Sequence, residues 1–268
     1  MMSSIFIGFV FAVLVSAVAF KLRSLDLTGA ISATLLGTII FGVGGWQWAI
    51  ILLIFFITSS ALSKAFKKKK VGLDEKFSKG SKRDWAQVFG NGGLAGLAAL
   101  LHGFYPDSGL IWLLFVASLA AVNADTWATE IGVLSPSQPR HILNLSKRVE
   151  KGTSGGISWV GSFGSLAGAF VVALPGALLS PYGHDWLTFT LLITFTGFSG
   201  GIFDSLLGAT AQAIYYCPVC EKETEKHPFH ICGTATNQIR GFFWLNNDLV
   251  NFGCSLFSVL AAWFLVGL

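Results

Sequence analysis

Residues 123–156 read NADTWATEIGVLSPSQPRHILNLSKRVEKGTSGG and separate two long apolar runs of the chain. One run, 110–122, ends where this stretch begins, and the next opens after Gly156. Asp125 and Glu130 come first in the stretch, a basic group follows, and a turn of small residues closes it. Carboxylates suit divalent cations, basic side chains neutralise phosphates, and glycines leave backbone N–H groups open to anions. We therefore predict the active centre here, between two membrane-spanning segments.

The sequence around this stretch has the composition of a polytopic membrane protein. Of its 268 residues, 53% are hydrophobic and 12% are charged, and the mean hydropathy is +0.66. Soluble domains carry about 25% charged residues. We predict an all-α membrane bundle, one integral membrane domain over 1–268, with about eight helices of the ~20 residues that cross a bilayer. The apolar segments are 4–20, 28–45, 46–62, 85–104, 109–125, 156–180, 186–214 and 248–267.

One pair of these segments is open to two interpretations. Segments 28–45 and 46–62 are short, and glycines interrupt the sequence between them. They form either a tight hairpin of two spans or a single re-entrant element.

The basic residues fall in alternate connections between these segments. All eighteen Lys and Arg residues lie in 21–27, 63–84, 126–155 and 215–247. The positive-inside rule places such loops in the cytoplasm. We therefore predict a cytoplasmic active face, both termini outside, and a multi-pass protein of the cell (plasma) membrane.

The basic cytoplasmic loop 63–84 holds nine of these cations. It is either a solvated loop that attracts anionic lipid head groups or, at its distal end, part of the site. The distal end runs into Asn91, a polar residue inside an apolar segment, where it should face a cavity or another helix.

Further carboxylates lie at the same predicted ends of the segments. Asp204 lies within a span, which indicates a functional residue, although a neighbouring helix could satisfy it. Asp248 opens the last segment, and Asp26, Asp125 and Glu130 share the same side. Carboxylates gathered in this way repel one another unless a cation or basic groups offset them. We predict a shared metal–phosphate site in which Asp125, Asp204 and Asp248 hold Mg²⁺.

A second cluster occupies the predicted cytoplasmic Cys/His loop 215–247. A CxxC pair is followed by a histidine and a third cysteine, a set compatible with tetrahedral zinc. Such a site would be structural, because four protein ligands leave no open position. The alternative is a set of reduced thiols without metal. The residues are Cys217, Cys220, His230 and Cys232.

The octapeptide 123–130, together with the turn 151–156, resembles the transmembrane protein 19 family, to which plant phytyl-phosphate kinase belongs. The similarity continues through 204–210 and 246–251. More distantly, an acidic motif followed by a Lys-Gly-Thr turn is similar to the CTP-dependent membrane lipid kinases. The resemblance implies phosphoryl transfer from a nucleoside triphosphate, with CTP the expected donor, to an isoprenoid monophosphate such as phytyl phosphate, giving the diphosphate.

The residue chemistry agrees with this activity, because phosphoryl transfer needs mainly positioning and charge neutralisation. Catalytic roles are expected for Asp125, Asn123, Glu130 and Lys151. In the catalytic and nucleotide loop 123–156, the triphosphate is expected at Lys147, Arg148, Gly152, Thr153, Ser154, Gly155 and Gly156. The lipid phosphate is expected at Lys82, Arg83 and Asn91.

Three other functions remain open at this point. An isoprenoid alcohol kinase would need a general base, for which Asp125 or Glu130 would serve. A CTP-dependent cytidylyltransferase would release pyrophosphate instead of a nucleoside diphosphate. A small-molecule transporter would also carry intramembrane carboxylates, although these gather at one face here. The expected partners are the bilayer, an isoprenoid phosphate and a nucleoside triphosphate, with no nucleic acid.

Overall fold

The computed structural model describes residues 2–66, 76–80, 82–183 and 185–267. Within these ranges eight α-helices form, in the places that hydropathy predicts. They are α1 (Met2–Lys21), α2 (Leu27–Gly44), α3 (Trp46–Ala65), α4 (Trp85–Phe104), α5 (Gly109–Gly132), α6 (Trp159–Leu178), α7 (Trp186–Thr210) and α8 (Asn247–Gly267). The predicted all-α bundle is confirmed. Residues 67–75 and 81 of the predicted basic loop 63–84 lie outside the described residues.

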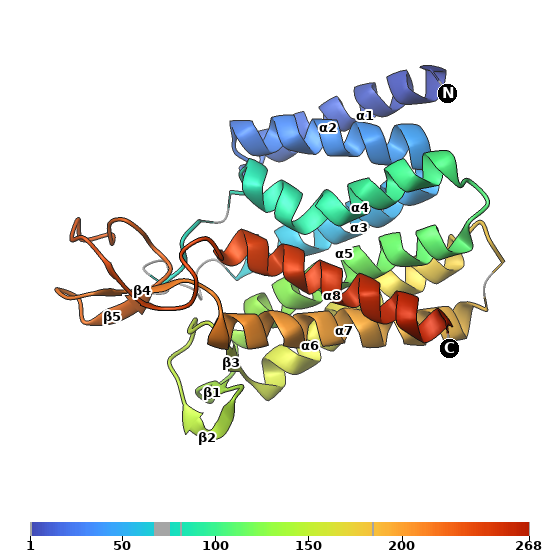
Figure 1. The fold of residues 1–268 in the computed structure, drawn as a ribbon. Helices are drawn as coiled ribbons and strands as arrows, with labels where there is room; N and C mark the ends of the chain where they lie inside the picture. The colour runs from blue at the N-terminus through green and yellow to red at the C-terminus, as the bar shows by residue number, and fades with distance from the viewer. Residues whose placement is uncertain (1, 67–75, 81, 184, 268) are drawn as a thin grey trace.

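Two small antiparallel sheets are added to the bundle. The first has the order β2-β1-β3 and the second the order β5-β4-β6. The strands are β1 (Arg140–His141), β2 (Asn144–Arg148), β3 (Gly156–Ile157), β4 (Ile214–Cys217), β5 (Lys222–Thr224) and β6 (Asn237–Arg240). Both sheets lie at one end of the helices, and both chain termini lie at the other end (Figure 1).

The helices α2 and α3 are separate elements, so the hairpin interpretation holds. Gly45 lies between them with φ +85°, a left-handed backbone conformation that favours glycine. Seven of the described helices are long and apolar enough to cross a membrane, and α4 is not among them. Its first turns carry Gln87 and Asn91, yet it runs alongside the other helices (Figure 1). Which end faces the cytoplasm stays a prediction.

Helix α5 is the most buried of these seven helices. Helix α6 approaches it through small residues, which let two helix backbones come close together. A Cβ atom at Gly164 would lie 2.9 Å from the carbonyl oxygen of Trp127, and one at Gly168 would lie 2.8 Å from that of Asn123. This close packing fixes the last turns of α5, where the predicted acidic motif lies.

The connection between α1 and α2 holds the segment that precedes α4. The backbone N–H of Arg83 donates to Ser24, and the N–H of Asp26 donates to the carbonyl oxygen of Arg83, each at 3.0 Å. A Cβ atom at Gly29 would lie 2.1 Å from that same oxygen. The Asp26 carboxylate caps α2 by accepting from the N–H of Gly29 at 2.7 Å. Asp26 is therefore a capping residue, and the prediction that it joins the other carboxylates is wrong.

Candidate active site

A cavity of about 600 Å³ lies at the sheet end of the bundle, between α5, α7 and the residues that precede α4. Its volume is that of a small-molecule site. Most of the predicted residues line it, from four separate parts of the chain. They are Arg83, Asn91, Asp125, Glu130, Lys151, Gly152, Thr153, Ser154, Gly155, Gly156 and Asp204.

The predicted boundary of the loop 123–156 is wrong at its first residues. Helix α5 continues to Gly132, so Asp125 and Glu130 lie on a helix. The loop begins at Val133 and contains the strands β1, β2 and β3. Because a helix is stiffer than a loop, the two carboxylates are held at fixed positions in the cavity wall.

Three side chains with oxygen atoms that could bind a cation line the cavity from α5, α7 and α8, namely Asp125, Asp204 and Asn251. The carboxyl groups of Asp125 and Asp204 lie close enough to interact. The Oδ2 atom of Asp204 and the Oδ1 atom of Asn251 are buried and have no hydrogen-bond partner among the described residues. Unpaired buried acceptors are costly, and neighbouring carboxylates repel each other. A hard divalent cation such as Mg²⁺ bound between Asp125 and Asp204 would offset this repulsion and supply the missing partner of Asp204.

Asp248 does not belong to this group. Its carboxylate forms an ion pair with Lys79, which also pairs with Asp84 at 2.8 Å. Asp248 does not line the cavity, whereas Asn251, less than one turn later, does. The structure therefore places Asn251, and not the predicted Asp248, on the cavity wall.

Asn123 lies in a different environment from the rest of the acidic motif. Its side chain is fully buried, and its Nδ2 atom donates to the carbonyl oxygen of Gly168 at 2.7 Å. Its Oδ1 atom accepts from the hydroxyl of Thr58 at 3.2 Å. These bonds join α5 to α6 and α3, so Asn123 packs the helices together and does not reach the cavity.

The cavity wall also carries a cation, Arg83. The guanidinium of Arg83 donates to the hydroxyl of Ser59 at 2.9 Å. Burial lowers the pKa of Arg83 to about 10, while the charge of Glu130 opposes this shift. Arg83 therefore stays charged at neutral pH. Glu130 itself accepts from the hydroxyl of Ser63 at 2.6 Å.

The glycine turn 152–156 is held against two helices. The ammonium of Lys151 donates to the carbonyl oxygens of Val133 at 3.0 Å and Ser135 at 2.6 Å, just after α5. Gly155 has φ +83°, and a Cβ atom there would lie 2.5 Å from that of Ala209 in α7. Lys151 thus positions the turn as well as adding positive charge to the cavity wall.

Glu225 is a site residue that the sequence did not reveal. Its Oε1 atom accepts from the hydroxyl of Ser154 at 3.0 Å and from the side-chain amide of Gln212 at 2.8 Å. Its Oε2 atom accepts from the N–H of Ser78 at 3.2 Å. Burial raises the pKa of Glu225, although these hydrogen bonds oppose the shift. Glu225 therefore ties the glycine turn, the end of α7 and the segment 76–80 together.

Three of the predicted cations lie outside the cavity. Lys147 and Arg148 are exposed on β2, and Lys82 is exposed before α4. The cavity is instead lined by Lys79 and Lys226, which the sequence did not single out.

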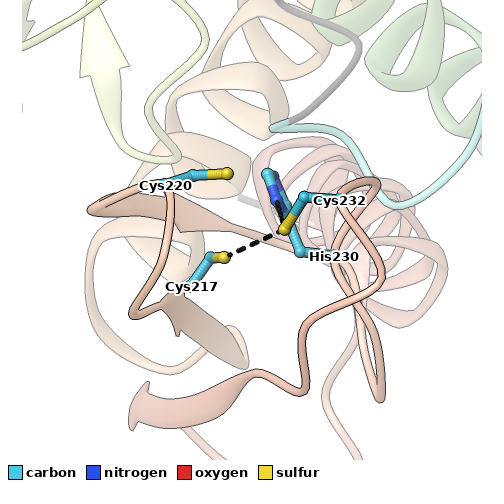
Figure 2. Close-up of side chains that lie close together, drawn as sticks. All are labelled: Cys217, Cys220, His230 and Cys232. Atoms are coloured by element: carbon cyan, nitrogen blue, oxygen red, sulfur yellow. Dashed lines mark hydrogen bonds between the residues drawn. The ribbon is translucent and has the colours of Figure 1, made fainter.

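The side chains of the Cys/His loop converge on one point, as Figure 2 shows. One ligand atom from each of four residues, Cys217, Cys220, His230 and Cys232, lies within 4.8 Å of the others. The sulfur atoms of Cys217 and Cys232 are 3.6 Å apart. Tetrahedral zinc with Zn–S bonds of ~2.3 Å separates its sulfur ligands by about 3.8 Å. The cluster is therefore compatible with structural zinc.

Two features of this cluster favour metal binding. The Nδ1 atom of His230 lies 3.4 Å from the sulfur of Cys232, inside the group. The hydroxyl of Thr234 and the ring of His230 lower the pKa of the Cys232 thiol to about 6, whereas the neighbouring Cys232 raises that of Cys220 to about 11, so Cys232 is the thiol more readily available as a thiolate ligand. The same loop carries Glu225 to the cavity, between Cys220 and His230 in sequence.

Comparison with known proteins identifies the family. Residues 10–259 match the family described as Integral membrane protein DUF92. The chain belongs to this family. The DUF92 chain is 34% identical to Protein PGR of Arabidopsis thaliana over 91% of each chain. It is 35% identical to the uncharacterized membrane protein MJ0933 of Methanocaldococcus jannaschii, over 70% of this chain and 75% of the relative.

A second plant relative of this DUF92 protein is Protein VTE6, chloroplastic, of Arabidopsis thaliana. It is 27% identical over 88% of this chain and 64% of its own length. No solved structure matches the chain. The DUF92 protein is thus an integral multi-pass membrane protein, and the predicted family resemblance is confirmed. Its residence in the plasma membrane stays a prediction.

Proposed function

We propose that this DUF92 protein transfers a phosphoryl group from a nucleoside triphosphate to an isoprenoid monophosphate, with CTP the expected donor. One observation carries the proposal: a single cavity is lined by the acidic side chains Asp125 and Asp204, by the turn 152–156 and by Arg83. These parts match the needs of phosphoryl transfer, which are a metal site, a phosphate-binding backbone and a cation. The resemblance to plant phytyl-phosphate kinase supports the same acceptor.

Each wall of the cavity has its own part in this reaction. Asp125, Asp204 and Asn251 would hold Mg²⁺, which when bound neutralises charge on the phosphates. The turn 152–156 offers backbone N–H groups to the triphosphate. Arg83, which lines the same cavity, would orient the phosphate of the lipid.

The transfer itself needs little chemistry from the protein. An oxygen of the lipid phosphate attacks the γ-phosphorus, the bond from the γ-phosphorus to the β,γ-bridging oxygen breaks, and the nucleoside diphosphate leaves. A phosphate monoester is largely ionised at neutral pH, because its second pKa is about 6. The acceptor therefore needs no strong base, and the side chains act by orientation and charge.

The test is to incubate the purified protein with Mg²⁺, CTP or ATP, and a panel of prenyl alcohols and prenyl monophosphates. The expected products are a prenyl diphosphate and a nucleoside diphosphate, identified by mass spectrometry. A monophosphate made from the alcohol would indicate an alcohol kinase, and pyrophosphate release would indicate a cytidylyltransferase. Either outcome, or no lipid product at all, would contradict the proposal.

A further inference from the structure

A second, smaller cavity adjoins the first. It has a volume of about 90 Å³ and lies between α1, α2, α3 and α4. Nearly all of its lining is apolar, and includes Phe11, Ala33, Leu36, Phe41 and Leu52. Three further residues, Arg83, Gln87 and Asn91, line both cavities. They form a common polar wall where the two spaces meet.

Arg83 faces both environments at this wall. Its guanidinium carbon lies 5.4 Å from the ring centroid of Phe55 and 5.5 Å from that of Phe56. Both rings line the apolar cavity. Cation–π contacts and the apolar stem of the arginine let its charge stand at an apolar surface. A fixed cation therefore marks the entrance from the polar cavity to the apolar one.

We propose that the apolar cavity binds the first part of the hydrocarbon tail of the lipid acceptor, with the acceptor phosphate at Arg83. This rests on the proposed function, which supplies an anionic head joined to an apolar chain. The negative charge of its head matches the positive charge of Arg83. The head suits the polar cavity, and the hydrocarbon chain suits the apolar one. A phosphate at Arg83 then lies in the same polar cavity that Asp125 and the turn 152–156 line.

The size of the apolar cavity limits how much of the tail it encloses. Its volume is well below the roughly 300–1,000 Å³ of sites that enclose a whole small molecule. Only the tail next to the phosphate fits, and the rest lies in the bilayer against the exposed apolar faces of α1 and α2, which include Leu14 and Leu35. Because the tail leaves one apolar medium for another, the cavity acts by packing and orientation more than by hydrophobic transfer.

Photo-crosslinking tests the position of the tail without using activity. The probe is a C20 prenyl monophosphate with a diazirine on its first isoprene unit, added to the full-length protein in phosphatidylcholine nanodiscs. We expect labelled peptides from the cavity walls on α2 and α3. Ala33→Leu, which fills the cavity, should reduce this labelling at least about fivefold. Ala167→Leu on the exposed face of α6, at a position that lines neither cavity, is the matched control and should leave it unchanged.

A phosphatidylcholine probe with its diazirine at a similar depth separates the acceptor tail from ordinary bilayer chains. We expect it to label the cavity walls much less than the prenyl monophosphate does. Equal labelling by the two probes, or labelling that Ala33→Leu does not reduce, would overturn the proposal.

Kinetics give a second readout. Ala33→Leu should raise the KM for the C20 monophosphate about tenfold, a loss of ~1.4 kcal/mol, and leave the nucleotide KM within about twofold. An active protein with unchanged lipid KM and unlabelled cavity walls overturns this inference alone. A protein that transfers no phosphoryl group but is labelled in the cavity overturns the proposed function and supports this inference.

Discussion

Two groups of candidate ligands lie at the same end of the molecule, and they differ in donor atoms and in closure. The oxygen group comes from three helices, is distant in sequence and opens onto a cavity of about 600 Å³. The Cys/His group comes from two turns within sixteen residues and supplies four ligands that lie together. A site with four protein ligands has no position for a substrate, whereas an open oxygen site does. This difference supports the proposal that the Cys/His group has a structural role and that the oxygen group takes part in the reaction.

The two groups also differ in the secondary structure that carries them. The candidate oxygen ligands lie on the long helices α5, α7 and α8, which pack against one another. The Cys/His loop has three short strands and little apolar core of its own, so a metal would contribute directly to its folding. Loss of the two groups should therefore give opposite patterns of activity and stability.

The largest effect is expected for Asp125→Asn. The substitution keeps the size of the side chain but removes the charge that would hold Mg²⁺. Phosphoryl transfer should fall at least about 100-fold, a typical cost of losing a key electrostatic group. Membrane insertion and melting temperature should stay normal, as followed by fluorescence-detected gel filtration.

Glu150→Gln is the matched control for that variant. The Glu150 side chain is 70% exposed, and its carboxylate pairs with Lys76 at 2.6 Å, outside the cavity. We expect activity within about twofold of the unmodified protein, because the Glu150 carboxylate is exposed and lies outside the cavity, although its partner Lys76 is buried. An active Asp125→Asn variant beside an inactive Glu150→Gln variant would place the centre on the wrong carboxylate.

The double substitution Cys217→Ser and Cys220→Ser should show the reverse pattern. Bound zinc, measured by elemental mass spectrometry, should fall from about one per chain to none. The melting temperature should drop by several degrees, because metal binding stabilises the folded loop. The rate per folded molecule should change far less than in Asp125→Asn. Unchanged melting of a zinc-free preparation would rule out the structural role.

A smaller effect is expected for Glu225→Gln. Glu225 belongs to the Cys/His loop and also lines the cavity, so it connects the two groups of candidate ligands. The amide has one acceptor where the carboxylate has two, so it cannot keep its bonds to Ser78, Ser154 and Gln212 together. The nucleotide KM should rise about fivefold, and kcat should be nearly unchanged. The corresponding loss of binding free energy is within the cost of losing one hydrogen bond to a charged group. A fall in kcat at unchanged KM would instead place Glu225 among the groups that contact the reacting phosphates.

Hydropathy and segment length predict the helices because a chain that crosses a bilayer needs long apolar segments. The predicted helices therefore differ from the observed ones mainly at their ends, where polar residues begin. The last two turns of α5, where Asp125 and Glu130 lie, contain polar residues. Hydropathy therefore predicts a loop there instead of the end of a helix. The meeting of Asp125, Asp204 and the glycine turn could be predicted, because the order of the spans brings them to one end.

Other parts of the site depend on information that the sequence does not carry. Whether Asp248 or Asn251 lines the cavity depends on the rotation of α8 about its own axis. Both residues are polar and close in sequence, so the sequence does not distinguish them. Glu225 lies in a charged run, 221–226, where no pattern distinguishes it from its neighbours. Lys147 and Arg148 resemble phosphate ligands by position, but β-strand pairing places them on an exposed hairpin.

The contact between Gly29 and the carbonyl oxygen of Arg83 has a genetic consequence. Any larger residue at position 29 must displace the backbone of the residue whose guanidinium stands between the two cavities. A random screen for inactive variants should therefore recover position 29, in a helix that supplies no residue to the polar cavity. Such variants would be inserted and folded yet inactive. Second-site suppressors should arise in the connection 22–26, which forms hydrogen bonds with the backbone of Arg83.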